Sequence, residues 1–327
     1  MFDASSVARE RYVTTELQRV QRLNYEHAAF VGAGAVGCYF GGMLARAGVP
    51  VTLIGRASHV DAIRRHGLFL ERTDFQEFIQ VNASADIDAV RNAGLVFVCV
   101  KTTDTETAAA AIAPHLSPGT VVVSFQNGVD NAERIQKITG VRAVPAVVYV
   151  ACAMSGPGRV KHNGRGDIVT GGPASMTERI ACVFEMARIP CRISDNIEGE
   201  LWTKLVMNCA YNAISALTRA RYSIITEDPR LREVMEEIIR EVVRVGGAEN
   251  VLLPAAERLI EAAFKLGETM ATATSSTEQD ISRGRPTEID SLNGYVVRRG
   301  KEFGIPTPAN FTVHALVKLI ERGIPRT

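Results

Sequence analysis

Three polar side chains recur along one largely apolar segment past the middle of the chain. Lys204, Asn208 and Asn212 follow one another at intervals of four residues. In a helix each such interval changes the direction by only about 40°, so the three side chains would share one stripe. A solvated helix face would account for the stripe, but asparagine is a poor helix former, and two at this spacing favour a buried polar site. A lysine beside two amides could stabilise and protonate an oxygen that gains negative charge.

A glycine-rich turn near residue 35 has the pattern of a dinucleotide site. It follows the apolar run 28–31 and precedes a helix of small residues, which is the context that makes the pattern specific. The first glycine permits the tight turn, the second lets the backbone approach a pyrophosphate, and the third lets the helix pack closely on the sheet. A turn without a ligand is the alternative. The residues expected at the cofactor are Gly32, Gly34, Ala35, Val36 and Gly37.

The charge that follows the second apolar run, 51–54, predicts which dinucleotide is bound. An NAD site usually has an acid there for the ribose 2′-hydroxyl, whereas this chain has Arg56. A guanidinium favours a 2′-phosphate, so the sequence predicts NADP(H). Lys101, after the apolar run 95–100, could add a second positive charge. The alternative is that both side chains merely lie at the surface.

Composition excludes several other classes of protein. The chain has 327 residues, 46% hydrophobic and 22% charged, with a formal net charge of +1, so neither a nucleic acid nor a membrane surface is an expected partner. No apolar run is long enough for a membrane span or a signal peptide. The six cysteines are scattered, without a CxxC pair or a histidine at ligand spacing, which predicts reduced thiols in a cytoplasmic protein and no metal site.

The order of expected elements predicts two domains after a leader. Strands at 28–31, 51–54, 95–100 and 120–124 alternate with helices, which indicates a doubly wound, Rossmann-type α/β domain. A glycine-rich region, 141–193, is expected to add antiparallel strands and to complete that domain. The rest is expected to be an all-helical C-terminal domain. Its expected helices are 199–218, 229–245, 254–271, 288–303 and 308–322. The predicted divisions are a partly ordered leader, 1–25, an NADP-binding domain, 26–195, and a helical catalytic domain, 196–327.

The helical domain also carries hydroxyls and a carboxylate. Ser275 and Ser276 open one polar segment, and Glu288 lies in another. Thr287 could cap a helix that begins at Glu288, and an acid is favourable in the first turn of a helix. Capping alone would therefore explain Glu288.

Six segments together make the chain resemble the ketopantoate reductase family (2-dehydropantoate 2-reductase) from about residue 26 to 322. They are GAGAVG at 32–37, KTTDT at 101–105, QNG at 126–128, WTKLVMNCAYN at 202–212, SSTEQDI at 275–281 and RPTEIDSLNG at 285–294. The last three are much more specific than the glycine turn. The leader departs from the family, whose first strand lies almost at the N-terminus.

The resemblance implies roles for individual residues. It implies that Lys204 and Glu288 are catalytic, that Asn208, Asn212 and Ser276 bind substrate, and that Asn127 lies close to both substrate and nicotinamide. The implied reaction is NADPH-dependent reduction of the 2-oxo acid 2-dehydropantoate to (R)-pantoate, on the route to pantothenate and coenzyme A.

Two other functions remain open at this stage. One is an NADP-dependent dehydrogenase of another small 2-oxo or hydroxy acid. The other is an NADP-binding sensor without turnover, which would have no use for a lysine–asparagine stripe together with a carboxylate. The sequence leaves the oligomeric state open, a homodimer included.

Overall fold

A computed structural model of the chain describes residues 26–323, so the expected leader lies outside the described residues. The described chain forms two compact units. Unit 1 holds the residues up to Val100 together with Asp104–Gln126 and Asn131–Asp195. Unit 2 holds the helical remainder from Asn196 together with two short segments, Lys101–Thr103 and Asn127–Asp130. Each unit has its own hydrophobic core.

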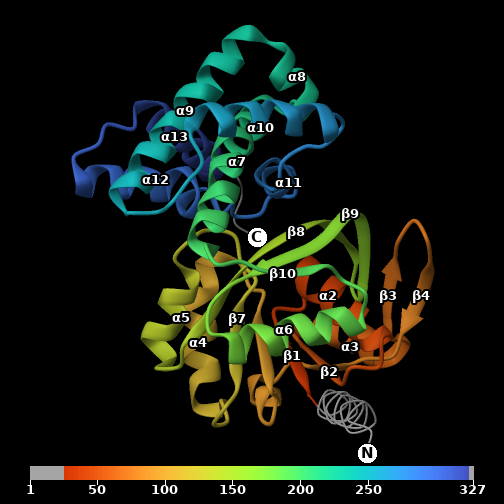
Figure 1. Cartoon of the computed structure of the whole chain (residues 1–327). Helices are drawn as coiled ribbons and strands as arrows, with labels where there is room; N and C mark the ends of the chain where they lie inside the picture. Colours follow the sequence, from red (N-terminus) through yellow and green to blue (C-terminus); the bar gives the residue numbers. More distant parts are fainter. Residues whose placement is uncertain (1–25, 324–327) are drawn as a thin grey trace, which may run out of the picture. The chain divides into compact units, whose positions relative to one another are not determined.

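The sheet of unit 1 is mixed and has ten strands within the described residues. Nine follow the spatial order β4-β3-β9-β8-β7-β6-β1-β2-β5, and β10 pairs with β9 (Figure 1). The strands are β1 (Ala28–Val31), β2 (Val51–Ile54), β3 (Leu68–Glu71), β4 (Gln76–Ile79), β5 (Asn82–Ser84), β6 (Leu95–Val98), β7 (Val121–Ser124), β8 (Ala143–Gly156), β9 (Arg159–Thr170) and β10 (Cys191–Ile193).

The four central strands β2, β1, β6 and β7 are parallel, and every one of their residues is buried. Such continuous apolar runs are typical of strands covered on both faces. Alternate residues enter different cores: Phe30 and Phe97 belong to one, whereas Val31 and Val98 belong to the other. The predicted α/β class with a doubly wound sheet is confirmed.

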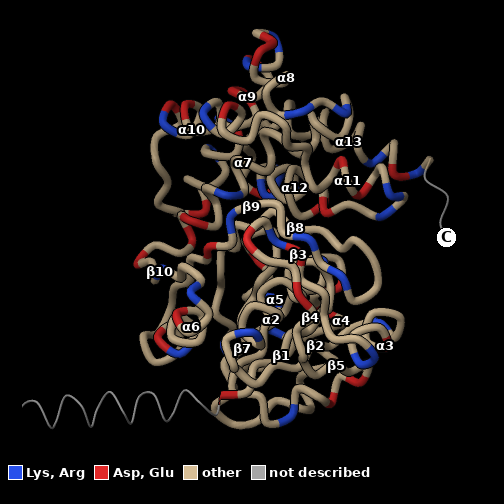
Figure 2. The backbone as a smooth tube through the Cα atoms, turned by 90° about the vertical axis from the view of Figure 1, so that its right-hand side faces the viewer, with Lys and Arg blue, Asp and Glu red and all other residues tan. Residues whose placement is uncertain are grey.

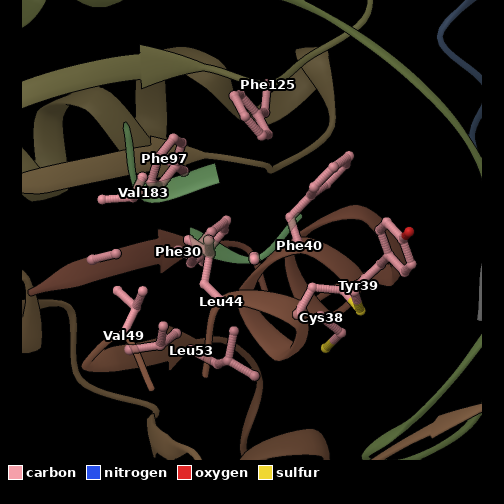
Figure 3. Close-up of a cluster of buried hydrophobic side chains, with 14 of the residues drawn as sticks. Phe30, Cys38, Tyr39, Phe40, Leu44, Val49, Leu53, Phe97, Phe125 and Val183 are labelled. Carbon is pink, nitrogen blue, oxygen red and sulfur yellow. The ribbon is translucent and has the colours of Figure 1, made fainter. Parts of the chain in front are cut away.

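Helices cover both faces of this sheet. On the first face lie α2 (Ala35–Arg46), α3 (Ala57–His66) and α6 (Ala174–Met186), and on the second lie α4 (Thr105–Ile112) and α5 (Asn131–Thr139). Aromatic rings fill the first core: Phe30 stacks on Phe97 at a centroid distance of 4.6 Å, and Phe40 meets Phe125 edge-on at 5.5 Å (Figure 3). These contacts hold α2, and with it the glycine turn, against the sheet.

The region 141–193 is only partly as predicted. β8 and β9 do form an antiparallel pair, but α6 follows them, and β10 is parallel to β9. The helix was missed because glycines dominate the pattern before it. Its own signal was present, since Ile180, Val183 and Phe184 recur at helical spacing and are fully buried.

Unit 2 is helical. Its helices are α7 (Ile197–Thr218), α8 (Tyr222–Glu227), α9 (Pro229–Ala248), α10 (Ala256–Thr269), α11 (Ser276–Ser282), α12 (Asn293–Phe303) and α13 (Pro308–Gly323). The central α7 packs against α9, α11 and α13. Positively and negatively charged residues alternate along α9 and α10 (Figure 2), and Arg240 of α9 forms an ion pair of 2.7 Å with Glu257 of α10. In the described part of the chain, no helix is both long and apolar enough to cross a membrane.

A buried carboxylate helps to hold α7 in place. Glu241 is 0% exposed and accepts hydrogen bonds from the backbone nitrogens of Ala309 and Asn310 at the start of α13, at 2.8 and 2.9 Å. Asn310 in turn accepts from the side chain of Asn293, which also donates to the carbonyl of Cys209 on α7 at 3.1 Å. This chain of polar contacts links α13 and α12 to the helix that carries Lys204.

Candidate active site

The glycine turn is fixed between β1 and β2 in unit 1. The backbone nitrogens of Gly32 and Ala33 both donate to the carbonyl of Ile54, at 2.9 and 2.8 Å. Gly32 has a φ of +112°, which residues with a side chain rarely adopt, and a Cβ there would lie 2.8 Å from the backbone of residues 99 and 100. The turn therefore depends on glycine at its first position.

The second and third glycines have different surroundings. A Cβ on Gly37 would lie 2.2 Å from the carbonyl oxygen of Gly32, so α2 can begin here only with glycine. A Cβ on Gly34 would meet nothing within 4 Å. That open space lies at the N-terminus of α2, where backbone N–H groups favour anionic oxygens. The turn thus has room for a pyrophosphate at the position where one is expected.

Arg56 lies next to this turn along β2. A Cβ on the preceding Gly55 would be only 2.6 Å from that of Ala33, which brings the end of β2 against the turn. Arg56 itself is exposed and precedes α3. Within residues 26–323 its guanidinium makes no hydrogen bond or ion pair, so its donors remain available to a phosphate.

The polar stripe of unit 2 lies on α7, as the spacing predicts. Asn212 is 3% exposed, while Lys204 and Asn208 are partly buried. The Asn212 amide nitrogen lies 3.5 Å from Oγ of Ser276, which opens α11. Ser275 caps α11 and donates to the carbonyl of Asn212 at 3.1 Å. The structure therefore brings together two of the residues that the resemblance assigns to substrate.

Glu288 lies in a second cluster of unit 2. Its Oε1 accepts from the backbone nitrogen of Thr102 at 2.8 Å and lies 3.0 Å from the hydroxyl of the same residue. Its Oε2 accepts from the side-chain amide of Asn127 at 2.9 Å. The short segments 101–103 and 127–130 thus supply the donors that hold this carboxylate.

The helix expected to begin at Glu288 begins later. A 3₁₀ turn, Ile289–Ser291, comes first, and α12 starts at Asn293. The hydroxyl of Thr287 accepts from the nitrogen of Ile289, the first residue of that turn, at 3.2 Å, although Glu288 is the N-cap residue. The carboxylate of Glu288 makes no such contact, since it is bound to Thr102 and Asn127. Capping therefore does not explain Glu288.

Comparison with known proteins assigns most of the described chain to one family. The family model described as ketopantoate reductase PanE/ApbA matches residues 28–174, and the model of its C-terminal part matches residues 196–321. The chain belongs to the ketopantoate reductase family. It is an oxidoreductase of the 2-dehydropantoate 2-reductase type, which acts with a nicotinamide cofactor on a small molecule.

Individual relatives match over most of their length. A 2-dehydropantoate 2-reductase of Pyrococcus abyssi is 32% identical over 88% of this chain and 95% of its own. A PanE/ApbA family ketopantoate reductase from Ralstonia eutropha JMP134 is 47% identical, with a TM-score of 0.87, over 91% of this chain and 99% of that one. A D-mandelate dehydrogenase solved with NADH and anilino(oxo)acetate is 25% identical, with a TM-score of 0.85, over 91% and 99%.

Lys101 of this family member has partners in unit 2. Its Nζ forms an ion pair of 2.8 Å with Asp280 of α11 and donates to the carbonyl of Pro286 at 2.7 Å. Burial raises the pKa of Asp280, and the hydrogen bond from Lys101 opposes that rise. A cofactor phosphate would have to share Lys101 with Asp280, so its expected role at the cofactor stays a prediction.

Three polar residues in or next to the candidate site were not singled out from the sequence. Thr102 and Asp280 contact residues that were, and Gln126 binds the carbonyl of Val100 and the hydroxyl of Thr105 at 3.1 and 2.7 Å. All three lie inside segments that carry the resemblance, KTTDT, SSTEQDI and QNG. Polar residues a few positions after buried strands, β6 for Thr102 and β7 for Gln126, were therefore the signal.

The cysteines take no part in this arrangement. None of the six forms a disulfide. Burial raises the pKa of Cys38 and of Cys152 to about 12, so both stay protonated and unreactive at neutral pH. In residues 26–323 no three His, Cys, Asp or Glu side chains are grouped to hold a metal ion.

Proposed function

We propose that this chain reduces 2-dehydropantoate to (R)-pantoate with NADPH, on the route to pantothenate and coenzyme A. The observation that carries the proposal is that unit 2 holds a lysine–asparagine stripe on α7 together with a carboxylate, Glu288, whose two oxygens are each fixed by donors. Within the ketopantoate reductase family, that combination suits a substrate with both a keto group and a hydroxyl group.

In this proposal unit 1 is the dinucleotide-binding domain. Gly34, Ala35 and Val36 at the start of α2 would hold the pyrophosphate in the open space beside the turn. Arg56 would bind the 2′-phosphate, since the sequence has no acid there for a 2′-hydroxyl. The expected roles of Asn127 at the nicotinamide and of Lys101 at the cofactor, both residues of unit 2, stay predictions.

Unit 2 would supply the chemistry at the substrate. When bound, reduced nicotinamide supplies the hydride that adds to C2 of the keto acid. Lys204 would donate a hydrogen bond to the keto oxygen, stabilise the charge that develops there, and transfer one proton to it. Asn208, Asn212 and Ser276 would orient the keto acid without adding charge.

Glu288 would act as a hydrogen-bond acceptor in this scheme. A carboxylate that is not protonated only accepts, and Glu288 already accepts from the N–H groups of Thr102 and Asn127. A substrate hydroxyl or the ammonium of Lys204 would supply the next donor. Glu288 would therefore select and orient a substrate, and Lys204 would be the acid.

A second candidate is the reduction of a 2-oxo acid with a bulkier side chain. The likeness to a D-mandelate dehydrogenase solved with NADH favours it, because mandelate is a 2-hydroxy acid with a phenyl group. The corresponding keto acid is phenylglyoxylate. The same relative makes NADH a second cofactor to test.

One assay separates these candidates. The oxidation of NADPH and of NADH is followed with 2-dehydropantoate, with phenylglyoxylate and with small aliphatic 2-oxo acids. The proposal expects the highest kcat/KM with NADPH and 2-dehydropantoate. Preference for phenylglyoxylate would establish the second candidate. No turnover with any of these acids would contradict both candidates and favour a protein that binds the dinucleotide without turnover.

A further inference from the structure

Thr102 is fully buried, and both of its polar hydrogens point at residues of the proposed site. Its exposed fraction is 0%. The backbone N–H donates to Oε1 of Glu288 at 2.8 Å. The hydroxyl lies 3.0 Å from the same oxygen and 2.8 Å from the backbone carbonyl of Asn127. We propose that Thr102 is a positioning residue that fixes the carboxylate of Glu288 relative to Asn127, an inference that rests on the proposed function.

The three residues form a closed set of contacts. Thr102 holds Oε1 of the carboxylate, the side chain of Asn127 holds Oε2, and the Thr102 hydroxyl reaches the backbone of Asn127. The carboxylate cannot rotate without breaking a hydrogen bond at one oxygen or the other. Its plane is therefore set before any substrate arrives, which lowers the cost of orienting it during the reaction.

The contacts also determine where a substrate donor binds. A carboxylate has roughly four acceptor sites, two on each oxygen. The N–H of Thr102 occupies one site of Oε1, its hydroxyl shares one hydrogen between the other site and the carbonyl of Asn127, and the Asn127 amide occupies one site of Oε2. The site that remains is on Oε2, beside the Asn127 amide. We expect the substrate hydroxyl, or the ammonium of Lys204, to donate there.

A buried threonine can instead serve only the fold, and this chain offers an example. The hydroxyl of Thr120 is 2.9 Å from the carbonyl of Ala93 in unit 1 and satisfies a buried backbone group. Replacing either threonine with valine keeps the shape and removes one hydroxyl. Thr120→Val is therefore a matched control for the loss of a buried hydrogen bond.

The first test is kinetic. With whichever 2-oxo acid the wild-type enzyme reduces best, Thr102→Val is expected to lower kcat/KM roughly tenfold to a hundredfold, the scale of a lost hydrogen bond to a charged group. Thr102→Ser restores the hydroxyl and should come within about threefold of wild type. Thr120→Val should lower the melting temperature without lowering kcat/KM. Normal turnover by Thr102→Val would overturn the proposal.

A double-mutant comparison shows whether Thr102 acts through Glu288. In a Glu288→Gln background, Thr102→Val should lower kcat/KM by a further factor of less than about three, because the carboxylate that Thr102 positions is already absent. An equal loss in both backgrounds would mean that Thr102 acts elsewhere, and the inference would be wrong.

A structural readout keeps the test independent of the substrate. Crystal structures of the Thr102→Val and Thr102→Ser proteins are compared at Glu288. We expect the carboxylate to shift in the valine variant, which keeps only the backbone N–H at Oε1, and to keep its place in the serine variant. An unmoved carboxylate in the valine variant contradicts the inference even if no 2-oxo acid is reduced, whereas the proposed function fails if the wild-type protein does not reduce 2-dehydropantoate or prefers another 2-oxo acid.

Discussion

The side-chain amide of Asn127 donates a hydrogen bond of 2.9 Å to Oε2 of Glu288, although 161 positions separate the two residues in the sequence. The contact unites QNG and RPTEIDSLNG, two segments that have no connection in a local reading of the sequence. It also shows that Glu288 is an oriented hydrogen-bond acceptor and not a helix-capping acid.

Glu288→Gln should reduce turnover while the fold persists. The amide keeps the shape but replaces one oxygen with an NH₂ group, which must then face the N–H of Thr102 or the amide of Asn127. We expect kcat to fall by on the order of 10- to 1000-fold and the melting temperature to change by a few degrees at most. Glu257→Gln, which changes an exposed carboxylate on α10, is the control. A destabilised but fully active Glu288→Gln enzyme would contradict the role.

Lys204→Ala should impair the chemical step. Without an ammonium at the keto oxygen, we expect single-turnover rates to fall by on the order of 10²–10⁴-fold while NADPH still binds. Lys204→Arg should not restore them, because a guanidinium has a different shape and does not release its proton. Lys265→Ala removes an exposed lysine from α10 and should have no effect. Near-normal single-turnover rates in either Lys204 variant would show that the stripe is only a solvated helix face and that Lys204 is not the proton donor.

The sequence was most informative where the pattern is local. β1 and β2 begin and end at the predicted residues because short apolar runs bounded by turns define them, and α7 begins at Ile197, two residues before its predicted start. Hydrogen bonds across the chain leave no periodic signal, which is why Thr102 was missed as a partner of Glu288, 186 positions away. The same limit applies to α12, since only the backbone shows that a 3₁₀ turn precedes it.

Two glycine substitutions test whether the turn binds a pyrophosphate. Gly34→Ala adds a methyl group to open space and should leave the melting temperature nearly unchanged. It should weaken the binding of NADPH at least tenfold, because that methyl group would occupy the expected position of the pyrophosphate. Gly37→Ala should instead destabilise the fold, since its Cβ would lie 2.2 Å from the carbonyl oxygen of Gly32. Calorimetry with and without NADPH measures both effects. Unchanged NADPH affinity in Gly34→Ala would contradict pyrophosphate binding at this turn.

Arg56→Ala should change cofactor preference. The exposed guanidinium at the end of β2 is expected to bind the 2′-phosphate, so its loss should weaken NADPH by about 1–3 kcal/mol and leave NADH nearly unaffected. Arg65→Ala removes a neighbouring exposed arginine, which contacts only the backbone of Asp61 among the described hydrogen bonds, and serves as the control. Fluorescence titration with both dinucleotides measures the change. Equal losses of affinity for NADPH and NADH would show that Arg56 does not bind the 2′-phosphate.

Acidic pH should lower the stability of unit 2 through Asp290, which lies two residues after Glu288. The hydrogen bond from His314, and then the one from Lys318, hold the pKa of Asp290 well below its ordinary value, and both contacts are 2.7 Å long. A carboxyl whose pKa is lower in the folded than in the unfolded state contributes stability above its unfolded pKa, about 4, and loses it as pH falls further. Because the side chain is half exposed, we expect Asp290→Asn to cost only about 1 kcal/mol or less at pH 7. The difference in unfolding free energy between wild type and variant, measured by urea denaturation from pH 7 to pH 3, should shrink toward the acid end. A difference that stays constant over this range would show that the Asp290 contacts do not depend on its charge.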